Sequence, residues 1–296
     1  MTKDYVIRAR TKDVPLRAFA ASTKEMVEQA RRIHHLTPLT SAALGRVLTA
    51  TAMMGQMLKS ENSKLTMQLK GDGPIGYVLA TGNGRGQVKG YVGNPQADLP
   101  LKSTGKLNVG AGIGQGTLNI IMDLGLKDPY VGSVALVNGE VADDLTHYFA
   151  ISEQTPSAVS LGVLVDRDQS IRASGGFIIQ VLPECPDSII DKLEENILQL
   201  PPITKMLDDN NDPVDVLKMV LKDFEIQFYG EQPVEYFCDC NRERLERVMI
   251  SIGEQELINI IKEDGKADLK CHFCNREYHF TRGDLERLLF SAIAKK

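Results

Sequence analysis

Two tight pairs of cysteines near the C-terminus constrain this chain more than any other feature of its sequence. The first pair is Cys238-Asp239-Cys240, and the second, Cys271-His272-Phe273-Cys274, follows after 30 intervening residues. Four of the five cysteines lie in these two pairs, which is hard to obtain by chance. Each pair is short enough to present two sulfurs to one ion, and the intervening segment can fold back to bring the pairs together.

Four cysteine sulfurs are the donor set of a closed, structural metal site. Four thiolates at about 2.3 Å around one Zn²⁺ form a tetrahedron that leaves no open position for a substrate. Soft sulfur ligands select zinc or an iron–sulfur cluster over Mg²⁺ or Ca²⁺. Because the sequence holds no further ligand cluster, we predict one zinc ion bound by Cys238, Cys240, Cys271 and Cys274.

Two roles are open to such a site. A tail of about 60 residues buries too little surface to be secure alone, and a metal that staples it is a common remedy. The single residue between Cys238 and Cys240 favours a further role, because it is tighter than the usual spacing of roughly two to four residues. Cysteines this close are also open to oxidation to each other, although the small ring is strained and therefore reducible. The same four sulfurs can thus be ligands in one state and disulfides in another.

Length, charge and the absence of leader signals favour a cytoplasmic globular protein. A chain of 296 residues predicts about two domains. A net charge of −5 disfavours a dedicated nucleic-acid binder. The first ten residues lack the apolar stretch of a secretory signal, and no run of about 18 apolar residues predicts a membrane span. Clustered cysteines without a signal peptide indicate a reducing compartment, and hence a cytoplasmic protein without a membrane partner.

Residues 1–180 are predicted to form an α+β core. Segments of alternating polarity, such as residues 65–69, are separated by glycine-rich turns typical of antiparallel hairpins. Strands and helices do not alternate regularly, which favours a mixed fold with antiparallel-rich sheets over a doubly wound parallel sheet. A helix that Ser41 opens and that ends at Leu58 is apolar around most of its circumference, so we expect it to be buried. The glycine-rich residues 82–86 lead into a strand rather than a helix, which disfavours a nucleotide-binding loop.

Residues 181–232 differ in composition and are predicted to form a helical linker. Prolines interrupt this segment, and residues 184–230 contain eleven acidic residues against four basic ones. Apolar residues such as Ile189 and Leu193 recur at helical spacing, which predicts amphipathic helices with acidic outer faces. Short isolated helices are marginal in water, so these helices need to pack against a neighbour. Cys185 has no sequence partner here, and we assign it no role.

Residues 233–296 are predicted to form a small zinc-binding domain. Asn241 precedes a first helix, and a second helix follows after a break. A hairpin over residues 267–280 carries the second cysteine pair. Thr281 and Asp284 resemble a capping box that opens a last helix.

The chain as a whole resembles the 33 kDa redox-regulated chaperonin family, a family of heat-shock holdases. The resemblance covers essentially the whole length, and it rests first on the two cysteine pairs at their observed separation. The combination with several shorter segments is highly specific. These segments are Ser41-Ala42-Ala43-Leu44-Gly45-Arg46, Gly73-Pro74-Ile75-Gly76, Gly90-Tyr91-Val92-Gly93-Asn94-Pro95 and Gly175-Gly176-Phe177-Ile178-Ile179-Gln180.

The resemblance implies both an architecture and a mechanism. The architecture is an N-terminal α+β core, a metastable linker and a C-terminal zinc redox switch. The mechanism is that the reduced, zinc-bound form is inactive, and that peroxide with heat, or hypochlorite, releases zinc. The resemblance further implies the disulfides Cys238–Cys240 and Cys271–Cys274 in the oxidised form, with unfolding of the switch. The linker and core then hold unfolding client proteins without ATP, commonly as a homodimer, so that the protein is a chaperone and not an enzyme.

Elementary energetics support a coupling between the metal and the linker. Structural zinc contributes about 10–16 kcal/mol to the folding of small modules, whereas whole domains are stable by only about 5–15 kcal/mol. Conversion of thiolates to disulfides removes the ligands, so the tail is expected to lose most of its stability. If the acidic helices of residues 184–230 dock against that tail, they melt with it and expose apolar stripes that can capture unfolded chains.

Two rival functions receive less support from the sequence. A zinc-ribbon module that binds nucleic acid needs a basic surface, but from Pro233 onward eleven Lys and Arg stand against twelve Asp and Glu. A thiol–disulfide oxidoreductase needs a Cys-x-x-Cys at the head of a thioredoxin-like helix, which is not found here.

Overall fold

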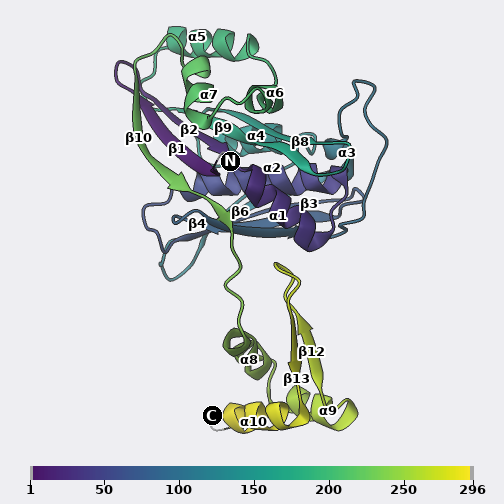
Figure 1. Cartoon of the computed structure of the whole chain (residues 1–296). Coiled ribbons are helices and arrows are strands. Elements are labelled where there is room, and N and C mark those ends of the chain that lie inside the picture. Colours follow the sequence, from purple (N-terminus) through teal and green to yellow (C-terminus); the bar gives the residue numbers. More distant parts are fainter. Residues whose placement is uncertain (1–2, 294–296) are drawn as a thin grey trace. The chain divides into compact units, whose positions relative to one another are not determined.

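The structure, a computed structural model, describes residues 3–293. The chain divides into two compact units, Met1–Phe237 and Cys238–Lys296 (Figure 1). Helices and mostly antiparallel sheets are mixed along the chain, so the predicted α+β class is confirmed. None of the helices formed by residues 3–293 has both the length and the apolar character needed to cross a membrane.

A five-stranded antiparallel sheet forms one half of unit 1. Its strands are β1 (Tyr5–Thr11), β2 (Leu16–Ser22), β8 (Ser157–Val165), β9 (Ile171–Val181) and β10 (Ile226–Pro233). They lie in the order β10-β1-β2-β9-β8, which leaves β10 and β8 at the two edges. β9 is buried along nearly its whole length, because helices contact it on both faces.

A six-stranded sheet forms the other half of unit 1. Its strands are β3 (Lys64–Gly71), β4 (Tyr77–Asn83), β5 (Gln87–Val92), β6 (Gly116–Asp123), β7 (Tyr130–Ala135) and β11 (Glu235–Tyr236). They lie in the order β11-β5-β4-β3-β6-β7. Burial alternates along β3, β4 and β5, as expected of strands with one face on the core and the other toward solvent.

Helices fill the space between the two sheets (Figure 1). The helices of this part of the chain are α1 (Lys24–His34), α2 (Pro38–Gly55), α3 (Val109–Ile113) and α4 (Val141–Ile151). α2 contacts strands of both sheets and is buried on nearly every side, as its composition predicts. It begins at Pro38 rather than at Ser41, because the Thr37 side chain accepts a hydrogen bond from the Thr40 amide at 3.2 Å and Pro38 fixes the first turn.

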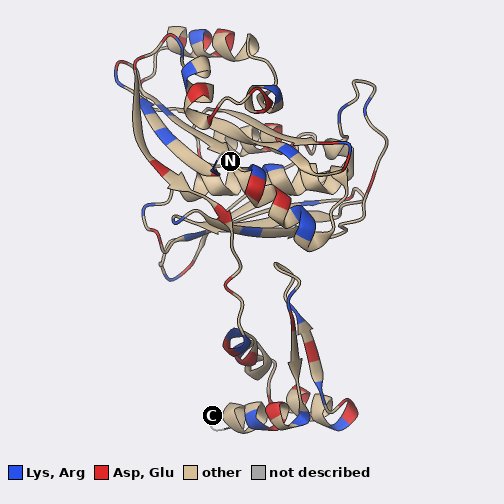
Figure 2. Ribbon diagram, in the orientation of Figure 1, with Lys and Arg blue, Asp and Glu red and all other residues tan. Residues whose placement is uncertain are grey.

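Three helices of the acidic segment 184–230, hereafter called the acidic helices, cover the outer face of the five-stranded sheet. They are α5 (Asp187–Leu198), α6 (Ile203–Asp208) and α7 (Pro213–Val220). Their apolar residues, including Leu193 and Leu217, share one buried cluster with residues of β1, β2 and β9. The acidic residues of α5 are exposed, and Figure 2 shows their positions along the helix. The predicted need for a neighbour is thus confirmed, and in unit 1 that neighbour is the five-stranded sheet.

α6 approaches this sheet closely because the strands beneath it carry glycine. A Cβ atom at Gly162 of β8 would lie 2.5 Å from Cγ2 of Thr204 and 2.8 Å from Cγ2 of Ile203. A Cβ atom at Gly175 of β9 would lie 2.7 Å from Cδ1 of Leu207. Even one methyl group at Gly162 therefore pushes against α6.

The last residues of unit 1 join its two sheets. β10 pairs antiparallel with β1, and β11 then pairs parallel with β5. We call residues 233–237 the strap. Tyr236 of the strap is only 5 % exposed, and its hydroxyl donates to the Gly90 carbonyl at 2.7 Å and lies 3.0 Å from Nε2 of His34. The strap is therefore anchored inside unit 1 two residues before the first cysteine of the metal motif.

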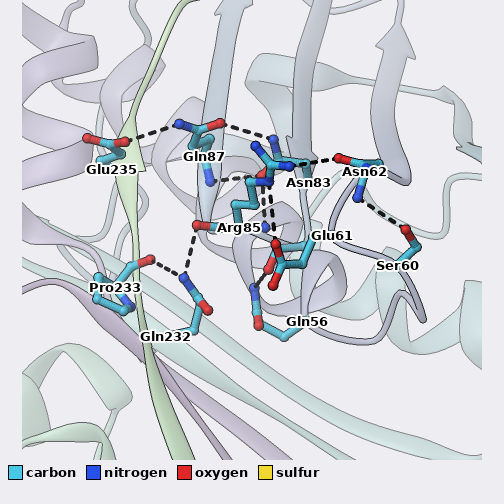
Figure 3. A network of polar contacts seen from close by, with 11 residues as sticks. Gln56, Ser60, Glu61, Asn62, Asn83, Arg85, Gln87, Gln232, Pro233 and Glu235 are labelled. Atoms are coloured by element: carbon cyan, nitrogen blue, oxygen red, sulfur yellow. Dashed lines mark hydrogen bonds and ion pairs between the residues drawn. The ribbon is translucent and has the colours of Figure 1, made fainter.

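Polar contacts also hold the strap against the turn between β4 and β5 (Figure 3). Nε2 of Gln232 donates to the Arg85 carbonyl at 3.0 Å. The Glu235 amide donates to the Gly86 carbonyl at 3.0 Å, and Nε2 of Gln87 donates to the Glu235 carboxylate at 3.4 Å. These contacts are near the surface, so Tyr236 is the deeper anchor.

Unit 2 is a small α+β module. Its elements are α8 (Arg242–Ser251), α9 (Glu254–Glu263), β12 (Ala267–Lys270), β13 (Glu277–Phe280) and α10 (Arg282–Ile293). The predicted hairpin and capping box are confirmed: β12 pairs with β13, and the Thr281 amide donates to the Asp284 carboxylate at 2.9 Å. Its core is small and consists of Met249, Leu257, Ile261, Phe280, Leu285 and Leu288.

A buried carboxyl group lies where α1, β1 and the strap meet. Asp4 is 6 % exposed, and its Oδ2 accepts from the Met26 amide at 2.7 Å, in the first turn of α1. Its backbone carbonyl accepts from the Val234 amide at 3.1 Å. Oδ1 has no hydrogen-bond partner among residues 3–293. Burial, more than any other cause, raises the pKa of Asp4 to about 7.

The raised pKa predicts a pH-dependent contribution to the stability of unit 1. Below the ordinary pKa of a carboxyl group, Asp4 is neutral in both the folded and the unfolded chain, and its contribution to stability is fully present. At higher pH the unfolded chain ionises first, so this contribution is lost as the pH rises through the folded pKa of about 7. The Asp4→Asn variant keeps an acceptor for Met26 but does not ionise, so its stability relative to wild type should increase between about pH 5 and pH 8.

Urea unfolding of the wild type and of Asp4→Asn across this pH range measures the difference in their unfolding free energies. The contributions of all other ionisable groups are the same in both proteins and cancel in the comparison. A difference in unfolding free energy that is constant across the range would show that Asp4 titrates normally.

Candidate metal centre

Four cysteine sulfurs converge in unit 2. The Sγ atoms of Cys238, Cys240, Cys271 and Cys274 all lie within 4.8 Å of one another. The Sγ atoms of Cys238 and Cys271 are 3.7 Å apart, and those of Cys240 and Cys274 are 3.2 Å apart. Ligands at the corners of a tetrahedron with metal–sulfur bonds of about 2.3 Å are separated by about 3.8 Å. The sulfur positions therefore fit one tetrahedral ion.

The first cysteine pair is held between the strap and α8. The Phe237 amide donates to the Val88 carbonyl at 2.9 Å, which fixes the backbone just before Cys238. After Cys240, the side chain of Asn241 accepts from the Arg244 amide at 2.8 Å and caps α8, as its position in the sequence predicts. In the sequence, the pair thus lies between the backbone hydrogen bond of Phe237 and the helix cap at Asn241.

The second cysteine pair lies in the tight turn between β12 and β13. The Cys271 amide donates to the Arg276 carbonyl at 2.9 Å, and the Asn275 amide donates to the Cys271 carbonyl at 2.8 Å. Asn275 has a φ of 56°, in the left-handed region that asparagine tolerates better than most residues. The turn folds Cys274 back beside Cys271, so both sulfurs point toward the first pair.

Tyr278 joins the two halves of the centre. Its hydroxyl donates to the Cys240 carbonyl at 3.1 Å and lies 3.2 Å from Sγ of Cys240. No local sequence pattern predicts this role, because a tyrosine in a hairpin is ordinary and its contact depends on how the hairpin meets the first cysteine pair. Such contacts around a metal site orient its ligands.

The surroundings of the thiols alter their acidity. Burial raises the pKa of Cys238, and burial likewise raises that of Cys274 to about 11. Burial also acts against ionisation of Cys240, but hydrogen bonds with Tyr278 and the neighbouring cysteines lower its pKa to about 7. Thiolates are the metal-binding form, and a bound cation supplies the positive charge that keeps several of them ionised together.

Other residues with ligand chemistry lie outside this group. Nδ1 of His279 lies 2.6 Å from the Asp268 carboxylate, with which it forms a separate pair. Cys185 lies in unit 1, where it packs beside the cluster beneath α5 and α7. Its sulfur lies 3.9 Å from the Pro186 carbonyl. The structure gives no reason for a cysteine at this position.

Removal of one sulfur should abolish metal binding and loosen unit 2. We expect the Cys271→Ser variant to retain almost none of the roughly one metal ion per chain that the wild type holds after dialysis, because three sulfurs leave an open, weaker site. Cys185→Ser is the matched control and should keep its metal. Metal analysis of both variants checks this, and a Cys271→Ser protein that keeps a full equivalent would show that the ion lies elsewhere.

Comparisons with known proteins agree with these features. A family model described as "Hsp33 protein" matches residues 4–281. A "33 kDa chaperonin" of Alkaliphilus metalliredigens is 50% identical over 285 residues, which cover 96% of this chain and 98% of the relative. One of Clostridioides difficile is 46% identical over 288 residues, or 97% and 99% of the two chains. The crystal structure of a 33 kDa chaperonin from Thermotoga maritima matches with a TM-score of 0.88 at 37% identity, over 98% of this chain and 99% of that one. The resemblance predicted from the sequence is thereby confirmed: the chain belongs to the Hsp33 family of chaperonins, which are molecular chaperones rather than enzymes.

Proposed function

We propose that this chain is a redox-regulated holdase that protects unfolding proteins from aggregation without ATP. Zinc bound by Cys238, Cys240, Cys271 and Cys274 holds the reduced form inactive. The observation that carries the proposal is the convergence of the four sulfurs within 4.8 Å of one another. The active protein is a homodimer in the cytoplasm, and its clients are unfolded or partly unfolded chains. Its functional division is a core of residues 1–180, a linker of 181–232 and a switch of 233–296.

Oxidation converts the four ligands into two disulfides. In each pair, one thiolate attacks peroxide, the O–O bond breaks, and the sulfur becomes a sulfenic acid. The second thiolate then attacks that sulfur, the S–S bond forms, and the oxygen leaves as water. The products are Cys238–Cys240 and Cys271–Cys274, and each disulfide consumes one peroxide and two protons and yields two waters. Neither pair then offers thiolates, so the ion is released.

The loss of the ion affects unit 2 first because its own core is small. About 10–16 kcal/mol of folding free energy comes from a structural zinc in comparable modules, which is as large as the total stability of many whole domains. The apolar cluster around Phe280 and Leu285 is all that remains to hold the module once the cysteines are oxidised. We therefore expect unit 2 to unfold on oxidation.

The strap is the route by which this unfolding reaches the acidic helices. α5, α6 and α7 are already packed on the five-stranded sheet, so their release does not follow from loss of unit 2 alone. However, β10 directly follows these helices and continues into the strap and Cys238. β10 is an edge strand with mostly exposed or half-buried residues, and it frays once unit 2 has unfolded and the strap has left its Tyr236 anchor. The helices then lose the support of the paired strand β10 on one side and expose the apolar cluster beneath them.

The rival functions gain no support from the structure. Basic and acidic residues are interspersed along α8, α9 and α10 (Figure 2). Arg242 pairs with Asp284 at 3.0 Å and Arg244 with Asp239 at 2.7 Å, so these cations are neutralised within unit 2. This pattern disfavours a nucleic-acid surface. Cys271 and Cys274 lie in a hairpin turn and not at the head of a helix, which disfavours a thioredoxin-like oxidoreductase.

The proposal predicts that activity appears only after oxidation. The zinc-loaded protein is treated with peroxide at raised temperature, and zinc release, helicity and suppression of the aggregation of a chemically unfolded client are followed together. The reduced protein should be inactive, and activity should rise with zinc release. Full anti-aggregation activity in the reduced, zinc-bound protein would contradict the switch.

A variant tests the role of the helices separately from the cysteines. Gly162→Ala places a methyl group against Thr204 and Ile203 and should loosen α6 without affecting the metal centre. We expect part of the anti-aggregation activity in its reduced form, with zinc still bound. Gly230→Ala in β10 is the matched control, because a Cβ atom there meets nothing within 4 Å. Equal inactivity of both reduced variants would show that release of α6 does not contribute to client binding.

A further inference from the structure

β8 presents unpaired backbone groups along a free edge of the five-stranded sheet. The Val181 amide donates to the Pro156 carbonyl at 2.9 Å, and the pairing continues with Ser157 opposite Gln180. In an antiparallel pair, alternate residues bond to the partner strand. Ser160 and Gly162 therefore bond to β9, whereas the amides and carbonyls of the alternate residues point away from the sheet.

These outward groups belong to Val159, Leu161 and Val163. No residue of the described range 3–293 gives their amides a hydrogen-bond partner. Leu161 and Val163 are nevertheless only 8 % and 7 % exposed. Backbone amides this close to the interior are usually paired, so an additional strand at this edge would complete their hydrogen bonding.

β8 also lacks the features that usually protect an edge strand. Its nine residues, Ser-Ala-Val-Ser-Leu-Gly-Val-Leu-Val, contain no charge and no proline. At the opposite edge of the same sheet, β10 carries Glu231 and Pro233, and its pairing with β1 is interrupted by an irregularity. Charge, proline and bulges are the devices that keep foreign strands from pairing with an edge. One edge is thus protected and the other remains open to pairing.

A groove runs beside this open edge. Its volume is about 540 Å³. One wall is β8 from Ser160 to Val165, a second is the loop that carries Leu101 and Leu107, and a third is the start of α6 at Ile203. Arg46 also lines the groove, and its buried Nε has no hydrogen-bond partner in the described part of the chain. The walls are mainly apolar, and an unused buried donor lies among them.

We propose that this groove receives an extended apolar segment of the client as an added strand beside β8. The inference rests on the proposed holdase function and specifies where and how the client is held. Main-chain hydrogen bonds to Leu161 and Val163 make capture independent of client sequence, and the apolar walls favour the segments that unfolded proteins expose. Because α6 forms one wall, its release on oxidation widens the groove.

Amide hydrogen exchange tests the bonding directly. The oxidised wild-type protein is examined with and without a reduced, carboxymethylated polypeptide that cannot refold. Addition of this polypeptide should slow exchange at Leu161 and Val163 on the order of tenfold or more, whereas Ser160 and Gly162, already bonded to β9, should change little.

Three outcomes would overturn the inference. One is unchanged exchange at Leu161 and Val163 while the polypeptide is bound. A second is slowed exchange at β7, the uncharged edge of the other sheet, in their place. A third is slowing that appears without the polypeptide and grows with protein concentration, which would assign the edge to a second copy of the chain.

A pair of matched variants tests the groove wall independently. Leu101 is 59 % exposed and lines the groove, whereas Leu126 is 72 % exposed and lies in the turn between β6 and β7. Leu101→Asp should weaken client protection by the oxidised protein several-fold, and Leu126→Asp should not. Equal protection of the client by both variants would show that the groove does not bind the client, and it would leave the proposed holdase function intact. If the oxidised wild type itself protects no client, the proposed function fails, and this inference fails with it.

Discussion

The convergence of four sulfurs on one point is the constraint on which unit 2 depends. The core of that unit is limited to a few side chains around Phe280 and Leu285, and its two cysteine pairs come from segments far apart in sequence. Burial raises the pKa of Cys238 and Cys274, so a bound cation supplies the positive charge that favours their thiolate form. In the proposed switch, the same chemistry makes the unit sensitive to oxidants, because the ligand form is also the oxidisable form. In that proposal, stability and redox sensitivity have one physical origin.

The packing of unit 1 determines how oxidation of the cysteines, as proposed, can affect α5, α6 and α7. The acidic helices bury their apolar faces on the five-stranded sheet, and α6 fits closely over Gly162 and Gly175. They are joined to the cysteines through β10 and the strap, and Tyr236 anchors the strap between the two sheets. In this arrangement the helices are not simply supported by unit 2. They hold by packing and are joined to the cysteines through an edge strand, so in the proposed switch their release depends on how far fraying extends back from Cys238.

Much of the site could be predicted from the sequence because its signals are local. The spacing of the cysteines, Asn241 before α8, and Thr281 with Asp284 before α10 each act within a few residues. The features that escaped prediction depend on pairings between distant segments. The pairing of β10 with β1, the parallel contact of β11 with β5, and the contact of Tyr278 with Cys240 leave no local pattern. The start of α2 was missed for a different reason: Thr37 and Ser41 are both acceptable caps, and only Pro38 distinguishes them.

Amide hydrogen exchange across residues 184–230, before and after oxidative release of the metal, tests the proposed switch most directly. We expect α5, α6 and α7 to lose most of their protection once the ion is gone, while α2, buried between the sheets, keeps its own. If these three helices remain as protected in the oxidised, metal-free protein as in the reduced protein, the metal centre does not control the client-binding surface.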